Sequence, residues 1–115
     1  MPSLKVQRIE IGDFAVYRLT GEFVVSTLIE LRKQLNADLA RHRSFYALDM
    51  AGVSLIDSSA MGLINNIKKK ADEKNGQLVL FSVPPIVTDN LQQIGILANL
   101  VIVKNEAEFR ENFLI

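Results

Sequence analysis

Residues 53–62 read VSLIDSSAMG, an apolar run that passes without a break into a polar one. Val53 to Ile56 has the composition of a strand end, and Asp57 is among the residues preferred at a helix N-cap. A strand that leads directly into a helix is the repeating unit of α/β folds with parallel strands. The stretch therefore predicts an α/β fold in which a helix starts at Asp57.

The helix after Asp57 is predicted to be amphipathic. At about 100° per residue its apolar residues gather on one face. That face consists of Ala60, Leu63, Ile64, Ile67 and Ala71. Ser58 lies about 180° from the centre of this face, so it is predicted to point to solvent, with Ser59 on the flank.

A stripe along the exposed side of this helix has the features of a binding surface. Gly62, Asn65 and Lys69 lie within about 40° of Ser58, and Met61 within about 60°. Gly62 costs about 1 kcal/mol relative to Ala inside a helix, and core packing does not explain it there. Close approach of another backbone would explain it, and a flexible apolar Met61 suits a contact surface.

The helix start at Asp57 has two interpretations. Several backbone N–H groups lack partners at a helix N-terminus and the helix dipole is positive there, so the site can accept a phosphate on Ser58. In the simpler interpretation Asp57 caps the helix and both serines are ordinary first-turn residues. The local pattern alone favours the simpler one.

Upstream of this stretch, Leu4 to Ile11 and Phe14 to Leu19 are rich in strand-forming residues. Gly12-Asp13 between them suits a two-residue hairpin turn with Gly first. Thr27 with Glu30 predicts a capped helix that runs to about Arg41. Its apolar stripe is Leu28, Leu31, Leu35 and Leu39, and the run from Phe45 to Met50 then predicts a strand.

Downstream, Gly76 suits a left-handed cap that ends the second helix near Asn75. Further strands are predicted at residues 77–83, before Pro84-Pro85, and at residues 100–103. A third helix carries Val87, Leu91 and Ile94 and stops at Gly95, and Asn105 with Glu108 caps a last helix bearing Ala107 and Phe109. The predicted order is β-β-α-β-α-β-α-β-α, a partly parallel sheet covered by helices.

Composition narrows the classes of function. The chain has 115 residues, 49% of them hydrophobic, which suits a single domain spanning residues 1–115. Thirteen basic residues balance thirteen acidic ones, so the chain has no net positive charge that would attract nucleic acid. No stretch reaches the roughly 20 apolar residues of a membrane span and no signal peptide is recognised, so a cytoplasmic location is expected.

Cysteine and histidine usage argues against most metal sites and catalytic triads. The chain has no cysteine, and His42 is its only histidine. Ser58 and Ser59 lack the Gly-x-Ser-x-Gly elbow of a serine hydrolase, and no glycine-rich loop cradles a phosphate. We expect no enzymatic activity, no cofactor and no metal. The basic run Lys68-Lys69-Lys70 with Lys74 suits either a docking patch or a solvated helix end, and the second is the commoner case.

Residues 53–62 resemble the signature of anti-sigma factor antagonists, which are members of the STAS family. Four further segments match the usual pattern of that family: Thr20-Gly21-Glu22, Asp49, Asn75-Gly76-Gln77 and Ile94-Gly95-Ile96. The resemblance covers nearly the whole chain. It implies a mixed, mostly parallel β-sheet with an N-terminal hairpin, and about four α-helices packed largely on one side.

The resemblance also implies a function by partner switching. The unphosphorylated protein would bind an anti-sigma factor that is also a serine kinase of the GHKL ATPase type. Phosphorylation at Ser58, the serine directly after the motif aspartate, would release it, and a PP2C-type phosphatase would restore it. The protein would be a monomer or weak dimer. The partner-binding residues are then expected to be Asp57, Ser58, Ser59, Met61, Gly62, Asn65 and Lys69.

Two positions depart from the family pattern. Val24 stands where the family often has an acidic residue near the phosphoacceptor, and Ala60-Met61 replaces the more usual Gly-Leu. Two other functions stay open. One is a non-phosphorylated STAS subunit of a transporter or other signalling assembly, and the other is a small-ligand-sensing STAS module.

Overall fold

A computed structural model describes residues 1–114 of the chain. The described part contains five strands, β1 Leu4–Ile11, β2 Phe14–Phe23, β3 Phe45–Ile56, β4 Gln77–Phe81 and β5 Val101–Val103. Its α-helices are α1 Ile29–Ala40, α2 Ser58–Glu73, α3 Pro85–Gln93 and α4 Glu106–Phe113, and a short 3-10 turn spans Leu97–Asn99. The predicted order of strands and helices is confirmed.

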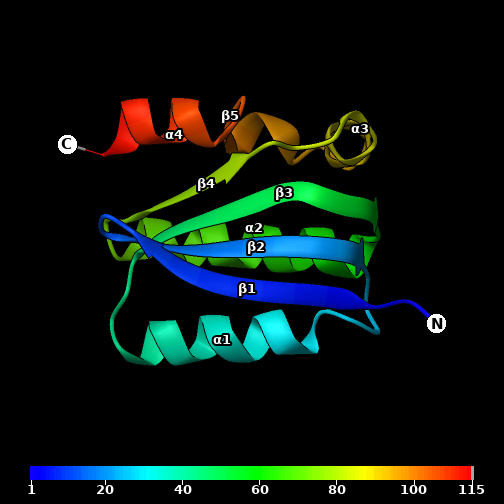
Figure 1. The fold of residues 1–115 in the computed structure, drawn as a ribbon, viewed down its shortest axis with the longest axis horizontal. Helices are drawn as coiled ribbons and strands as arrows, with labels where there is room; N and C mark the ends of the chain where they lie inside the picture. Colours follow the sequence, from blue (N-terminus) through cyan, green and yellow to red (C-terminus); the bar gives the residue numbers. More distant parts are fainter. Residues whose placement is uncertain (115) are drawn as a thin grey trace.

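The strands form one sheet in the order β1-β2-β3-β4-β5 (Figure 1). β1 and β2 are an antiparallel hairpin, and the other three pairings are parallel. Gly12 starts the predicted two-residue turn with φ +57, which glycine adopts without a steric cost. β2 runs on to Phe23, beyond the predicted end at Leu19, because residues 20–23 still pair with β3.

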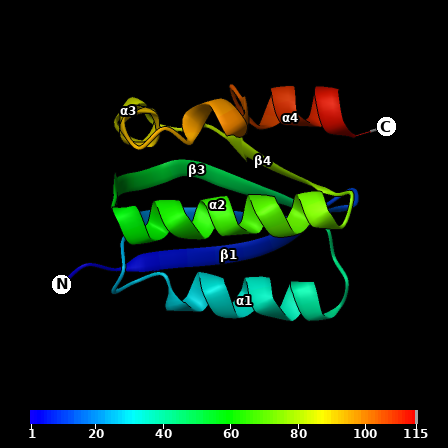
Figure 2. The same ribbon diagram turned by 180° about the vertical axis from the view of Figure 1, so that it is seen from behind.

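Helices cover the two faces of the sheet unequally. Parallel neighbours joined by right-handed crossovers carry their connecting helices on the same face, and this places α1, α2 and α3 together. Figure 2 shows α2 lying across that face with α1 beside it. α4 packs on the opposite face, so the prediction of helices largely on one side is confirmed.

The two faces bury separate apolar cores. The larger core lies between the sheet and α1, α2 and α3, and includes Tyr17, Leu48, Ile64 and Leu91. The smaller core lies under α4, where the ring of Phe109 stacks on Phe81 with centroids 5.2 Å apart. Fully burying aromatic and aliphatic side chains of this size contributes about 1.5–3 kcal/mol each. The sheet is therefore packed on both faces, by α1, α2 and α3 on one side and by α4 on the other.

β3 contains two irregularities that set up the start of α2. The pairing register with β2 shifts between Arg18 and Thr20, and again between Gly21 and Glu22. Met50, Val53 and Ile56 are all buried in the larger core, a spacing of three that a regular strand would place on alternate faces. The bulges thus bring Ile56 into the core and leave Asp57 at the rim.

The predicted N-cap of α1 is wrong. The Thr27 hydroxyl accepts the Val24 N–H at 3.1 Å and donates to the Glu22 carbonyl at 2.6 Å, so it closes the turn before the helix. α1 begins two residues later at Ile29 and has no side-chain cap. A threonine side chain reaches nearby turn groups as readily as a helix N–H, and here the turn competes successfully.

The predicted residue at the end of α2 is also wrong, although the location is right. Asn75 and not Gly76 adopts the left-handed conformation, with φ +58. The Gly76 N–H then bonds to the Ala71 carbonyl at 2.8 Å and the Asn75 N–H to Asp72 at 3.1 Å, a Schellman motif. Gly76 is needed for another reason, because a Cβ there would lie 1.9 Å from the Ser44 carbonyl oxygen.

The third helix differs from its prediction at its end. α3 ends at Gln93, and Ile94, which was predicted to be one of its apolar residues, is 48% exposed and does not pack in the core.

An ion-pair network ties α1 to the hairpin. Asp38, which is buried in α1, accepts two hydrogen bonds from Arg8 at 2.8 and 2.9 Å and one from the Tyr17 hydroxyl. Arg8 also contacts Glu10 at 2.6 Å, and Glu10 in turn pairs with Arg43 at 2.8 Å. Hydrogen bonds from Arg43, followed by those from Arg8, lower the pKa of Glu10 to about 2.

This network predicts a specific acid sensitivity. The pKa of Glu10 is lowered by folding, so its contribution to stability is complete above about pH 4.5 and is lost as the pH falls toward about 2. The Glu10 side chain is 49% exposed, so solvent screening keeps the contribution below about 1 kcal/mol. Glu10→Gln should flatten the fall in unfolding free energy over that pH range in urea titrations. An exposed control, Glu111→Gln, should leave the slope unchanged, and equal slopes in both variants would refute the assignment.

Candidate functional site

The candidate site lies where the parallel strands end. The carboxyl ends of β2, β3 and β4 share one edge of the sheet, and each is followed by a helix. The loops that follow neighbouring parallel strands meet at this edge, and binding residues are concentrated on such loops. Ser58 is the first residue of α2, so it lies at this edge, beside the connection from β2 to α1.

Asp57 organises the edge through both of its carboxylate oxygens. Oδ1 accepts the Ala60 N–H at 3.0 Å, which is the predicted N-cap bond of α2. Oδ2 accepts the Val25 N–H at 2.9 Å and so holds the loop after β2 against the helix start. The Asp57 N–H donates to the Phe23 carbonyl at 3.3 Å. One side chain thus fixes both the loop and the helix terminus around Ser58.

Removing this carboxylate should loosen the edge measurably. Asp57→Ala loses a helix cap and the Val25 tether, and we expect a loss of about 1–2 kcal/mol in unfolding free energy. Asp57→Asn keeps one acceptor oxygen and should lose about half as much. Asn105→Ala removes the comparable cap of α4, remote from the site, and serves as a control. Amide hydrogen exchange at Val25 should rise in both Asp57 variants and stay constant in the Asn105 variant. Unchanged exchange at Val25 in Asp57→Ala would contradict the tether.

Ser58 presents its hydroxyl to solvent, as its helical phase predicts. The residue is exposed, and its side chain makes no hydrogen bond to the described residues, whereas neighbouring Asp57 is fully engaged. Ser59 is exposed as well, so accessibility alone does not separate the two serines. The terminal N–H groups of α2 and the helix dipole create a positive potential beside both.

The stripe below Ser58 is open along the helix. Gly62 is exposed, and a Cβ added there would meet no atom within 4 Å, so nothing within the described chain requires glycine. Asn65 is half-buried and Lys69 is exposed. Lys69 lies 11 residues beyond Ser58, about 16 Å along the helix axis, and so marks the far end of the stripe.

Met61 is the one predicted surface residue that the structure places inside. It is only 6% exposed and belongs to the larger core, so the expectation that it offers an apolar contact at the surface is wrong. Leu63 and Ile67 on the other flank of α2 face α1. Met61 lies on the opposite flank of α2, and its long flexible side chain packs in the larger core.

Two exposed apolar residues at this edge were not predicted as site residues. Val25 is 61% exposed and is tethered to Asp57, and Leu55 is 43% exposed two residues before it. The sequence feature that indicates this exposed apolar surface is the pair Val24-Val25 directly after a strand. Val24 itself is half-buried in the same loop, so the position that departs from the family pattern does lie near Ser58.

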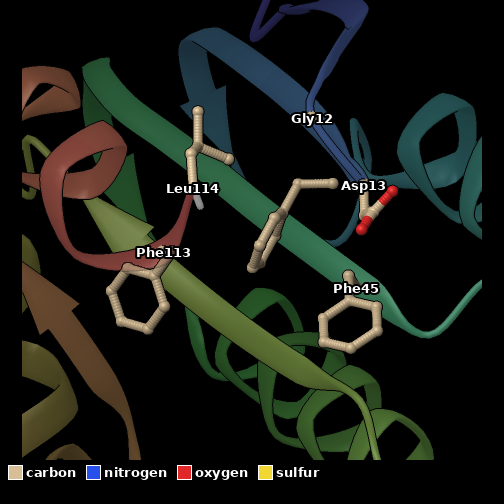
Figure 3. A pocket seen from close by; sticks show the side chains of 6 residues that line it. Gly12, Asp13, Phe45, Phe113 and Leu114 are labelled. Atoms are coloured by element: carbon tan, nitrogen blue, oxygen red, sulfur yellow. The ribbon is translucent and has the colours of Figure 1, made fainter.

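A cavity also lies apart from this site. It measures about 390 Å³ and lies at the opposite edge, against the hairpin turn and the end of α4. Figure 3 shows the rings of Phe45 and Phe113 on its two sides, with Asp13 on the side of Phe45. Within residues 1–114 no three metal-ligating side chains cluster, and no helix there is long and apolar enough to cross a bilayer.

Comparisons with known proteins identify the family. The family model for the STAS domain matches residues 5–109, nearly the whole chain. A putative anti-sigma factor antagonist from Thermotoga maritima superimposes with TM-score 0.81 at 22% identity, over 92% of each chain. The phosphorylated form of SpoIIAA, a Bacillus cell fate determinant, gives TM-score 0.72 at 16% identity, over 94% of this chain and 97% of that one.

A third solved structure shares the fold within a larger protein. The murine Solute Carrier 26 family member A9 anion transporter gives TM-score 0.68 at 14% identity, over 84% of this chain but only 17% of the transporter. The comparison with curated proteins returned no match. The family model spans both the strand and helix that flank Asp57 and the hairpin that precedes them, and the chain therefore belongs to the STAS domain family.

Proposed function

We propose that this protein is an anti-sigma factor antagonist that works by partner switching. In this proposal the unmodified protein binds an anti-sigma factor that is also a serine kinase of the GHKL ATPase type. Phosphorylation of Ser58 releases the complex, and a PP2C-type phosphatase restores binding. The protein itself has no catalytic role. The observation that carries the proposal is the exposed, unbonded Ser58 hydroxyl directly after a fully engaged Asp57.

The local electrostatics suit a reversible phosphate. A phosphoserine adds about −1.5 to −2 charges, and the terminal N–H groups and dipole of α2 stabilise negative charge at its start. Asp57 supplies the side-chain bonds that fix the start of α2, and the Ser58 side chain makes no hydrogen bond to the described residues. The fold therefore does not need the Ser58 hydroxyl. Modification can therefore change the surface without unfolding the helix.

The proposed docking surface extends from the loop after β2 along α2. It comprises Asp57, Ser58, Ser59, Gly62 and Asn65, with Lys69 at its far end, and the exposed apolar residues Val25 and Leu55 beside it. Met61, being buried, is not part of it. An apolar centre next to a polar rim is the usual anatomy of a protein interface. Val25 and Leu55 replace Met61 as the expected apolar contacts.

The relatives support this choice. SpoIIAA, which shares the fold, is known in an unphosphorylated and a phosphorylated form, with TM-scores of 0.74 and 0.72 to this chain. The Thermotoga maritima and Mycobacterium paratuberculosis neighbours are both described as anti-sigma factor antagonists, the former as a putative one. A relative with this fold that exists in both forms supports a phosphorylation switch at the exposed Ser58.

A second candidate is a non-phosphorylated STAS subunit of a transporter or other assembly. The anion transporter that contains this fold favours it, as does Val24 in place of an acidic residue near Ser58. The two candidates differ in whether Ser58 is modified in cells. That difference makes phosphate incorporation the deciding observation.

The proposal predicts that Ser58 and not Ser59 receives the phosphate. Ser58 lies opposite the buried face of α2, whereas Ser59 lies on the flank. Incubating the purified protein with ATP and extract of its own cells should label the wild type and Ser59→Ala, and should leave Ser58→Ala unlabelled. Labelling that survives in Ser58→Ala and disappears in Ser59→Ala would reject the assignment.

A further inference from the structure

A groove between α1 and α2 lies on the helical side of the molecule, apart from the edge where α2 begins. Its volume is about 230 Å³. Eight residues line it, four from each helix: Arg32, Leu35, Asn36 and Leu39 of α1, and Leu63, Asn66, Ile67 and Lys70 of α2. Figure 2 shows these two helices side by side across the sheet. The proposed docking surface contributes none of these residues.

The groove is amphipathic in a specific way. Leu35, Leu63 and Ile67 are buried side chains that form an apolar floor, with half-buried Leu39 at one end. The polar lining residues are two cations and two amides: Arg32, Lys70, Asn36 and Asn66. No acidic residue lines the groove. A small strip of hydrocarbon thus adjoins a rim that is rich in hydrogen-bond donors.

The two cations of the rim have no counter-ion within the described chain. Neither Arg32 nor Lys70 belongs to an ion pair of residues 1–114, although the adjacent Lys68 pairs with Asp72 at 2.5 Å. The side-chain amides of Asn36 and Asn66 likewise make no hydrogen bond there. Two like charges on one groove repel each other, and an anion bound between them would relieve this repulsion.

We infer that the groove binds a small amphipathic carboxylate. The carboxylate would accept charge-assisted hydrogen bonds from Arg32 and Lys70, and a short hydrocarbon tail would cover the leucine and isoleucine floor. The volume falls below the roughly 300–1,000 Å³ typical of drug-sized ligands, so the tail must be short. A phosphate without a tail would leave the apolar floor exposed, and no glycine-rich loop is present to hold it.

Titration with octanoate, followed by NMR of ¹⁵N-labelled protein, tests this site directly. The side-chain amide signals of Asn36 and Asn66 should shift progressively, together with backbone amides of the two lining segments. Acetate and inorganic phosphate should bind about four-fold more weakly, because neither covers the floor. Equal binding of all three anions, or shifts centred on Phe45 and Phe113, would overturn the proposal.

Matched variants separate the groove from general charge attraction. Arg32→Ala with Lys70→Ala should lower octanoate affinity about ten-fold or more. Lys33→Ala with Arg41→Ala removes the same charge from exposed positions outside the groove, and should change affinity less than about two-fold. Asn66→Trp, at an exposed position on the rim, should block binding without a charge change. Equal losses in the two double variants, or full binding by Asn66→Trp, would show that the groove is not the site.

Discussion

Phosphorylation of Ser58 is expected to weaken binding to the cognate kinase by about 30-fold to several thousand-fold while leaving the fold intact. The phosphate places about −1.5 to −2 charges beside Asp57, in a surface that a partner must desolvate to dock. An uncompensated charge in a buried contact costs about 2–5 kcal/mol, which corresponds to this range of affinity. The terminal N–H groups of α2 stabilise the same charge in the free protein.

Two substitutions reproduce the two states. Ser58→Asp should lose part of the affinity, because it carries less charge on a shorter side chain, and Ser58→Ala should bind constitutively. Thermal unfolding and affinity for the kinase that modifies the protein should be measured on the same preparations. A Ser58→Asp variant that unfolds, or that binds as tightly as Ser58→Ala, would contradict electrostatic exclusion at this surface.

Substitutions of Gly62 are expected to change stability and binding in opposite directions. A Cβ at this position meets no atom within 4 Å, so Gly62→Ala should stabilise α2 by up to about 1 kcal/mol. Glycine at position 62 therefore does not stabilise the fold. We attribute its presence to the close approach of the partner's backbone. Gly62→Ala should weaken binding modestly, and Gly62→Arg should weaken it by at least about 30-fold through steric exclusion.

A control variant must show that the effect of Gly62→Arg comes from its position and not simply from the added bulk and charge. Ala37 is exposed on α1, outside both the docking surface and the α1–α2 groove, so Ala37→Arg adds the same side chain elsewhere. It should leave kinase affinity unchanged. If Gly62→Arg binds as well as Ala37→Arg, Gly62 does not lie in the interface and the proposed surface is misplaced.

Local patterns predicted most of this fold because they act over short distances. The Gly12-Asp13 turn, the buried face of α2 and the capping pair of Asn105 with Glu108 each depend on residues within one or two turns. The outward orientation of Ser58 follows from helical phase alone. The STAS fold then follows because right-handed crossovers leave few arrangements for alternating strands and helices.

The Thr27 cap failed for a local reason, because its hydroxyl bonds to Val24 and Glu22 in the preceding turn, whereas the other differences at the site have tertiary causes. Helical phase placed Met61 near the exposed stripe, but the phase of α2 alone does not show how far around the helix the larger core extends. The bulges of β3 arise from its pairing with β2. The exposure of Val25 depends on its bond to Asp57, a residue 32 positions away. No local pattern contains these contacts.

The central claim is that Ser58 is the phosphorylation switch of this protein. The most direct test is intact-mass analysis of protein purified from its own cells, with peptide mapping of any modification. The account predicts a fraction of molecules carrying one phosphate group, mapped to Ser58, which treatment with a PP2C-type phosphatase removes. Protein that carries no phosphate under any growth condition, or carries it only at Ser59, would contradict the account.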